Sequence, residues 1–160
     1  DIFDKDHNGK SYGRYAHPGY AWAIRRETYN KIGGLMDMCC LGSADYLMAM
    51  SFVGWNNKVI RKTMSPGYKK YIETWGNRAF RVVNRNVGYV PGTLLHHWHG
   101  KKTQRGYWDR ELAIDKLQYD PYTMLRPDTN GLWALDNPDG HLRDAIRIIM
   151  RARNEDSIDL

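Results

Sequence analysis

The chain has 160 residues, of which 42% are hydrophobic and 12% aromatic, a length and composition that fit one globular domain and exclude a disordered chain. No apolar run is long enough to cross a bilayer and no signal peptide is visible, so the sequence predicts a protein without a membrane span. The formal net charge of +6 predicts an anionic partner, such as a nucleotide diphosphate, a nucleic acid or an acidic surface.

The distribution of charge limits the kind of anionic partner, and the two cysteines indicate the cellular compartment. The 24 lysines and arginines are mixed with 18 acidic residues and form no run of five or six, which argues against a dedicated nucleic-acid-binding arm. Cys39 and Cys40 are adjacent and are not expected to bridge each other. We expect them to act as small hydrophobic residues in a reducing, cytoplasmic compartment.

The first residues contain an acidic pattern with two interpretations. The stretch from Asp4 to Gly9 begins like a calcium-binding loop, but the twelfth position, which needs a glutamate, holds Tyr15. Its Asn-Gly pair favours a tight hairpin turn instead. Asp4 and Asp6 also match the short Asp-x-Asp motif with which sugar transferases bind a metal, although only two apolar residues precede it where a buried strand is expected.

The next segment predicts a strand and a short helix. From His17 to Arg26, a Pro-Gly turn precedes an apolar run, which indicates a turn that enters a buried strand. A helix is expected from Glu27 to Ile32, and Gly33-Gly34 would end it. Leu35 to Leu41 is expected to form a loop.

A second helix is expected to begin at Asp45, because four apolar residues follow at helical spacing. Ser43 or Asp45 would be its N-cap, an interaction that stabilises a helix by about 1 kcal/mol. A cap is the structural explanation for Asp45. The functional explanation is that a helix N-terminus favours a negative charge and aims the carboxylate at a substrate.

A longer helix is expected to begin at Ser65-Pro66, since proline suits the first turn of a helix. Its apolar residues recur at helical spacing and predict a buried face made of Tyr68, Tyr71, Ile72, Trp75, Ala79, Val82 and Val83. Most of these aromatic rings are therefore expected in the core, and not on a surface that stacks nucleic-acid bases.

The segment from Asn86 to Trp98 is expected to be a strand that ends among three histidines, His96, His97 and His99. In an extended chain, successive side chains alternate between two faces, so His97 and His99 would point the same way. These two imidazoles are candidate ligands of a divalent metal. The alternative is that they are hydrogen-bonded groups at the edge of the core.

Four cations follow the histidines: Lys101, Lys102, Arg105 and Arg110. They are candidates for holding a phosphate, although basic residues after a glycine also occur in solvated turns. The helix expected from Arg105 to Leu117 begins with two of them, where a positive charge is unfavourable to the helix dipole. We therefore expect Arg105 and Arg110 to interact with something else, for example an anionic ligand.

The remaining residues predict turns and one more helix. Turns are expected at residues 119–121, 126–128 and 130–133, followed by a helix from His141 to Met150 with arginines on its outer face. Residues 154–160 are expected to form a loose acidic tail. Without repeats or a linker, residues 1–160 are expected to form a single mixed α/β or α+β unit.

Five segments in this order carry a family resemblance: residues 17–23, 33–35, 41–45, 97–100 and 105–110. They resemble the C-terminal half of GT-A-type glycosyltransferases, especially a group of bacterial and bacteriophage glycosyltransferase-like proteins. The resemblance covers about residues 17–159. It implies the C-terminal portion of a GT-A fold, with few strands flanked by helices, in the cytoplasm of a bacterial or phage-infected cell.

The resemblance also implies an activity and a site. A sugar would pass from a nucleotide-diphosphate donor to a hydroxyl of a carbohydrate or other acceptor, with Mn²⁺ or Mg²⁺ beside the diphosphate. Asp45 matches the candidate base, and His99, or else His97, would complete the metal site. The residues implied in substrate and diphosphate binding are Trp22, Gly34, Lys101, Lys102, Arg105, Tyr107 and Arg110.

Two departures from the family pattern keep other hypotheses open. Many GT-A enzymes carry paired acids where this chain has Ala44-Asp45, and nothing in the chain matches the family's donor-binding N-terminal half. We therefore expect the chain to be part of a larger transferase that needs this half as a partner, or a reduced relative. The second hypothesis is a non-catalytic module that binds carbohydrate or protein, and the third is a basic nucleic-acid-binding domain.

Overall fold

The computed structural model describes residues 18–95, 106–136 and 140–152. In these ranges the elements are α1 (Arg26–Ile32), α2 (Ala44–Phe52), α3 (Asn56–Val59), α4 (Pro66–Val83), α5 (Tyr107–Lys116), α6 (Pro121–Met124), β1 (Leu125–Pro127), β2 (Trp133–Leu135) and α7 (His141–Ala152). The fold is mixed α/β, as predicted, but it is mostly helical with one small antiparallel sheet. Among the described helices, none has the length and hydrophobicity needed to cross a bilayer.

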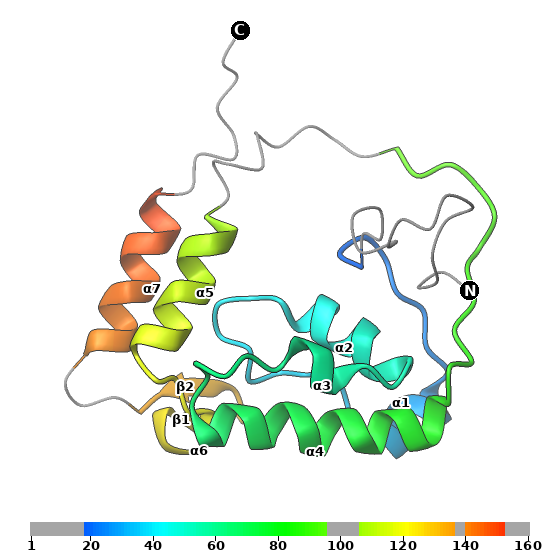
Figure 1. Cartoon of the computed structure of the whole chain (residues 1–160), viewed down its shortest axis with the longest axis horizontal. Coiled ribbons are helices and arrows are strands. Elements are labelled where there is room, and N and C mark those ends of the chain that lie inside the picture. The colour runs from blue at the N-terminus through cyan, green and yellow to red at the C-terminus, as the bar shows by residue number, and fades with distance from the viewer. Residues whose placement is uncertain (1–17, 96–105, 137–139, 153–160) are drawn as a thin grey trace, which may run out of the picture.

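Helix α4 is the element on which the other parts of the core pack, and it runs along one side of the molecule (Figure 1). It begins as predicted: the Ser65 hydroxyl accepts a hydrogen bond from the Tyr68 N–H at 3.1 Å, and Pro66 occupies the first turn. The predicted face is buried at Tyr68, Tyr71, Ile72, Trp75 and Ala79. Val82 shares this face but lies in the last turn and is exposed.

Helix α2 packs closely against the middle of α4 through the last turn of α2. The two helices meet where Gly76 faces Ser51, since a Cβ at residue 76 would lie 2.8 Å from the Ser51 hydroxyl. Next to this contact, the rings of Phe52 and Trp75 lie 5.8 Å apart. A small residue on each helix therefore allows the close approach, and the aromatic pair fills the space beside it.

Helices α5 and α7 lie side by side at one end of the molecule (Figure 1). Tyr119, just after α5, is fully buried and ties this end to the core. Its hydroxyl donates to the Met38 carbonyl, and its own carbonyl accepts a hydrogen bond from the Ser65 hydroxyl. The loop before α2, the start of α4 and the end of α5 are thus joined through the side chain and the backbone carbonyl of Tyr119.

The predicted turns between residues 119 and 133 form a short helix and a hairpin. Strands β1 and β2 pair antiparallel, with Arg126 opposite Ala134. The Asp128 carboxylate accepts hydrogen bonds from the N–H groups of Asn130 and Leu132 and orders the turn between the strands. The turn at Asn130-Gly131 was predicted correctly, but residues 126 and 127, predicted as part of a turn, lie in β1, and neither α6 nor the strand pairing was predicted.

Two predicted strands are wrong for the residues that the structure describes. Residues 18–25 and 86–95 have no regular secondary structure, and Tyr89, Val90 and Leu95 are 79%, 89% and 92% exposed. A strand requires a neighbour that pairs with its N–H and C=O groups, and the described sheet contains only β1 and β2. The apolar pattern alone could not supply that neighbour. The predicted tail, residues 154–160, lies outside the described ranges.

Candidate functional site

The turn from Leu41 to Ser43 brings α2 and α5 together. Gly42 (φ +98°) and Ser43 (φ +67°) both adopt left-handed backbone conformations, which turn the chain into α2. Arg110 of α5 reaches this turn and donates from Nη1 to the Leu41 carbonyl at 3.2 Å. A Cβ at Gly42 would lie 2.8 Å from the same nitrogen, so this position needs glycine for its backbone and for the approach of Arg110.

Arg110 has one polar atom that the described protein does not satisfy. Its guanidinium carbon lies 4.4 Å from the centre of the Tyr107 ring, which fits a cation–π contact. Its Nε is buried and has no hydrogen-bond partner among the described residues. Buried donors are nearly always paired, so this unpaired nitrogen is an exception among the described residues. Arg110 was expected to interact with a group other than the helix dipole. Its hydrogen bond to Leu41 and its contact with the Tyr107 ring meet this expectation in part.

Asp45 lies in the first turn of α2 and is partly buried. The N-cap position belongs to Ser43, and no side chain caps this helix. The structural explanation of Asp45 as a cap is therefore wrong. Its carboxylate faces the chain at Gly19, where a Cβ would lie 2.8 Å from Oδ2.

Trp22 and Gly34, the other two candidate residues in this half of the chain, lie in different places. Trp22 packs edge-on against Phe52 with ring centres 5.7 Å apart, so the segment that carries it runs along α2, on which Asp45 lies. Gly34 lies in the turn after α1, where its carbonyl accepts a hydrogen bond from Trp75 Nε1 at 3.2 Å. The Gly34 carbonyl therefore connects this turn to α4 through a hydrogen bond.

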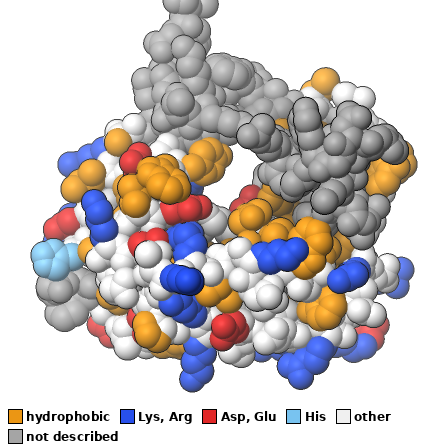
Figure 2. Space-filling view, in the orientation of Figure 1, with side chains coloured by type: hydrophobic (Ala, Val, Ile, Leu, Met, Phe, Trp, Pro, Cys, Tyr) orange, Lys and Arg blue, Asp and Glu red, His pale blue; other side chains and the backbone are white. Residues whose placement is uncertain are grey.

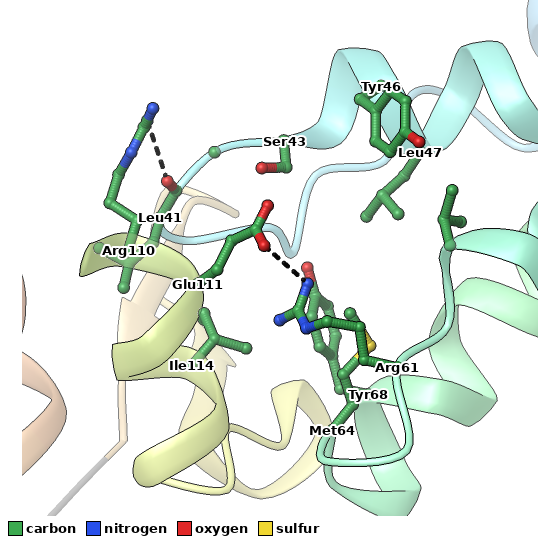
Figure 3. A pocket seen from close by; sticks show the side chains of 12 residues that line it. Leu41, Ser43, Tyr46, Leu47, Arg61, Met64, Tyr68, Arg110, Glu111 and Ile114 are labelled. Atoms are coloured by element: carbon green, nitrogen blue, oxygen red, sulfur yellow. Dashed lines mark hydrogen bonds and ion pairs between the residues drawn. The ribbon is translucent and has the colours of Figure 1, made fainter. Parts of the chain in front are cut away.

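A shallow pocket lies between the start of α2, the loop before α4, and α5 (Figure 3). Its empty space, including the part open to solvent, is about 430 Å³. Arg110 and Ser43 form part of its wall, whereas Asp45 does not line it. Arg110 of α5 thus contacts the turn that precedes the helix of Asp45, but of the two residues only Arg110 lines this pocket.

An ion-pair cluster joins the opposite wall of the pocket to α5. Arg61 bonds Asp115 through two nitrogens, at 2.8 and 3.1 Å, and its Nη1 lies 3.3 Å from Glu111 Oε2. Burial raises the pKa of Asp115, but hydrogen bonds from Arg61 and Thr63 outweigh this effect and hold it below the ordinary value. Asp115 is therefore charged at neutral pH and fixes Arg61 in place.

The two cysteines lie near this site, but their thiols are unreactive. Burial raises the pKa of the Cys39 thiol to about 12 and that of the Cys40 thiol to about 11. Both side chains pack against the hydrophobic core. They are therefore neutral at pH 7 and poor nucleophiles or metal ligands, which agrees with the prediction that they act as small hydrophobic residues.

The rest of the predicted site lies outside the described residues. This holds for the candidate metal ligands and most of the candidate diphosphate ligands, namely His97, His99, Lys101, Lys102 and Arg105. Within the described ranges, no group of three or more His, Cys, Asp or Glu side chains is placed to hold a metal. On the face in Figure 2, Lys and Arg side chains are scattered among acidic and hydrophobic ones.

Sequence reasoning missed the pocket and its ion pairs. Arg61 and Glu111 are 50 residues apart, and no motif links them. The spacing of Glu111 and Asp115 on the predicted helix does place both carboxylates on one face, which was the available signal.

Comparison of this chain with protein-family models, with curated proteins and with solved structures found no match.

The contact between Gly42 and Arg110 gives a testable prediction. Gly42→Ala is expected to lower the free energy of unfolding by about 1–3 kcal/mol, because alanine is strained at this positive φ and its Cβ displaces Arg110. Gly131→Ala is the matched control, since Gly131 also has a positive φ (+76°) but no atom within 4 Å of the added Cβ. Urea denaturation of both variants measures the difference. Equal losses would show that the contact with Arg110 contributes nothing.

Proposed function

We propose that this chain is the acceptor-side part of a glycosyltransferase that moves a sugar from a nucleotide-diphosphate donor to a hydroxyl acceptor. The observation that carries the proposal is the turn at residues 41–43, which Arg110 contacts and which leads directly into the helix that carries the Asp45 carboxylate. Sugar transfer from a diphosphate needs both groups: a base for the acceptor hydroxyl and a positive charge for the departing phosphates.

In the proposed reaction, Asp45 takes the proton of the acceptor hydroxyl, whose oxygen then attacks the anomeric carbon. The bond from this carbon to the diphosphate breaks, and the diphosphate leaves with the electron pair. Arg110, held by Leu41 and over Tyr107, stabilises the charge that develops on the phosphates. Lys101, Lys102 and Arg105 belong to this diphosphate site on the sequence pattern alone.

A divalent metal belongs to the same proposal. His99, or else His97, would hold Mn²⁺ or Mg²⁺, which neutralises charge on the diphosphate when it is bound. Trp22 and Gly34 remain candidates for substrate binding, Gly34 on the acceptor side. The partners are the sugar donor, the acceptor and the donor-binding half of the domain.

Calorimetric titration tests the metal part of the proposal. Uridine and guanosine diphosphates are titrated, with and without manganese, into the chain together with its donor-binding half, and binding is expected only with the metal. His99→Ala is expected to weaken this binding by about tenfold or more, because a ligand is lost from the metal. His141→Ala, an exposed histidine at the start of α7, is the control and is expected to change nothing.

The second hypothesis, a non-catalytic module, makes the opposite prediction. Such a module binds carbohydrate or protein and ignores both manganese and the diphosphate. Heats that are insensitive to manganese and to His99→Ala would therefore contradict the transferase and favour the module. A nucleic-acid-binding domain would instead show affinity for nucleic acid that falls steeply with salt.

A further inference from the structure

The pocket between α2 and α5 combines an apolar floor with unused polar groups. Leu47, Met64 and Ile114 are buried and line it from three different elements. The Tyr46 ring, also part of the lining, is 47% exposed. A ligand in this pocket would therefore meet both a hydrophobic surface and an aromatic face.

The polar side of the pocket has hydrogen-bonding capacity left over. Glu111 projects from α5 towards the start of α2, and its Oε2 lies 3.3 Å from Arg61 Nη1 (Figure 3). Its Oε1, and the hydroxyls of Ser43 and Tyr46, have no hydrogen-bond partner among the described residues. An ionised carboxylate can accept hydrogen bonds at both oxygens, so Glu111 can bind a ligand hydroxyl without giving up Arg61.

We propose that this pocket binds one neutral sugar ring, with hydroxyls held by Glu111 and Arg61 and a C–H face against Tyr46. The choice of a sugar rests on the proposed function, and the position of the ring beside Arg110 and the residues that hold it are new. A sugar ring matches the lining because it has hydroxyls on its edge and apolar C–H groups on its faces. The bound sugar ring belongs either to the nucleotide-sugar donor or to a carbohydrate acceptor.

Other ligand classes fit this lining less well. A phosphate or carboxylate beside Glu111 would meet its negative charge, and the partner Arg61 is already bound to Asp115, so an anionic group fits only at the Arg110 end of the pocket. A purely apolar ligand would cover Glu111 and Ser43 and leave their polar atoms unsatisfied. A neutral, hydroxylated ligand avoids both costs.

The test begins with free monosaccharides. Glucose, galactose, mannose and N-acetylglucosamine are titrated into ¹⁵N-labelled protein, with the amide signals of Gly42, Ser43 and Glu111 followed by NMR. At least one sugar is expected to shift these signals. Glu111→Gln is expected to weaken this sugar's binding by about tenfold or more, because hydrogen bonds to charged groups are the stronger ones.

Glu73→Gln is the matched control, because Glu73 is an exposed glutamate of α4 that does not line the pocket. It is expected to leave sugar binding within about twofold of the wild type. The proposal is overturned if none of the four sugars shifts the pocket signals. It is equally overturned if Glu111→Gln binds the sugar as well as the wild type does.

A transfer assay with Glu111→Gln then identifies the source of the ring. A higher KM for the nucleotide sugar alone assigns the pocket to the donor, and a higher KM for the acceptor alone assigns it to the acceptor. Transfer with both KM values unchanged would overturn the pocket and leave the proposed function standing. If a sugar binds in a way that depends on Glu111 but no transfer occurs, the pocket is supported as a sugar-binding site and the proposed function is contradicted.

Discussion

Asp45→Asn is expected to lower kcat/KM for sugar transfer by about 10²–10⁴-fold, the contribution that a positioned general base makes. Asparagine has nearly the shape of aspartate but cannot take the proton of the acceptor hydroxyl. The N-terminal turn of α2 is expected to stay intact, since Asp45 does not cap the helix. Donor binding, measured by calorimetry with a nucleoside diphosphate and manganese, is expected to remain within about threefold of the wild type.

The control for this variant is another first-turn aspartate. Asp144→Asn changes an exposed carboxylate at the start of α7 that pairs only with its neighbour Arg143 among the described residues. It is expected to transfer sugar at the wild-type rate. If Asp45→Asn also keeps the wild-type rate, Asp45 is not the base. If it loses donor binding together with the rate, its role is positional.

Trp75→Ala is expected to lower the free energy of unfolding by about 3–5 kcal/mol, the usual cost of removing a large buried aromatic ring. Trp75 is 3% exposed, packs against Phe52 and donates from Nε1 to the Gly34 carbonyl. Its loss leaves a cavity under α2 and an unpaired carbonyl after α1. Urea denaturation, followed by circular dichroism, measures the change.

Trp108→Ala provides the comparison, since Trp108 lies on α5 and is 70% exposed. Its expected change is within about 0.5 kcal/mol, as for most surface substitutions. A similar loss in the two variants would mean that α5 depends on Trp108 for a contact outside the described residues. A small loss in Trp75→Ala would show that the core between α2 and α4 repacks.

Several elements were predictable because their signals are local. Ser65-Pro66 starts α4, and Gly33 ends α1 in a left-handed conformation that glycine adopts without strain. The starts of α5 and α7 were also predicted within about two residues, as expected for long periodic segments. Each of these signals acts within one or two turns of the chain.

The candidate site was predictable only as residue types. The sequence drew attention to Asp45 as a carboxylate near the start of a helix and to Arg110 as a cation in conflict with a helix dipole. It contained no sign that Arg110 contacts Leu41, 69 residues earlier. It also gave no reason to connect Arg61 with Glu111.

By itself, therefore, the sequence determined where five of the seven described helices begin, which face of α4 is buried, and that the cysteines act as small hydrophobic residues. Only the tertiary structure decided that residues 86–95 are not a strand, that Arg110 contacts the turn before the helix of Asp45, and that a pocket lies beside Arg110. The reason is the range of the interactions. Caps, turns and helical periodicity depend on neighbours in the chain, whereas strand pairing, ion pairs and pockets depend on which distant segments α4 and its core hold together.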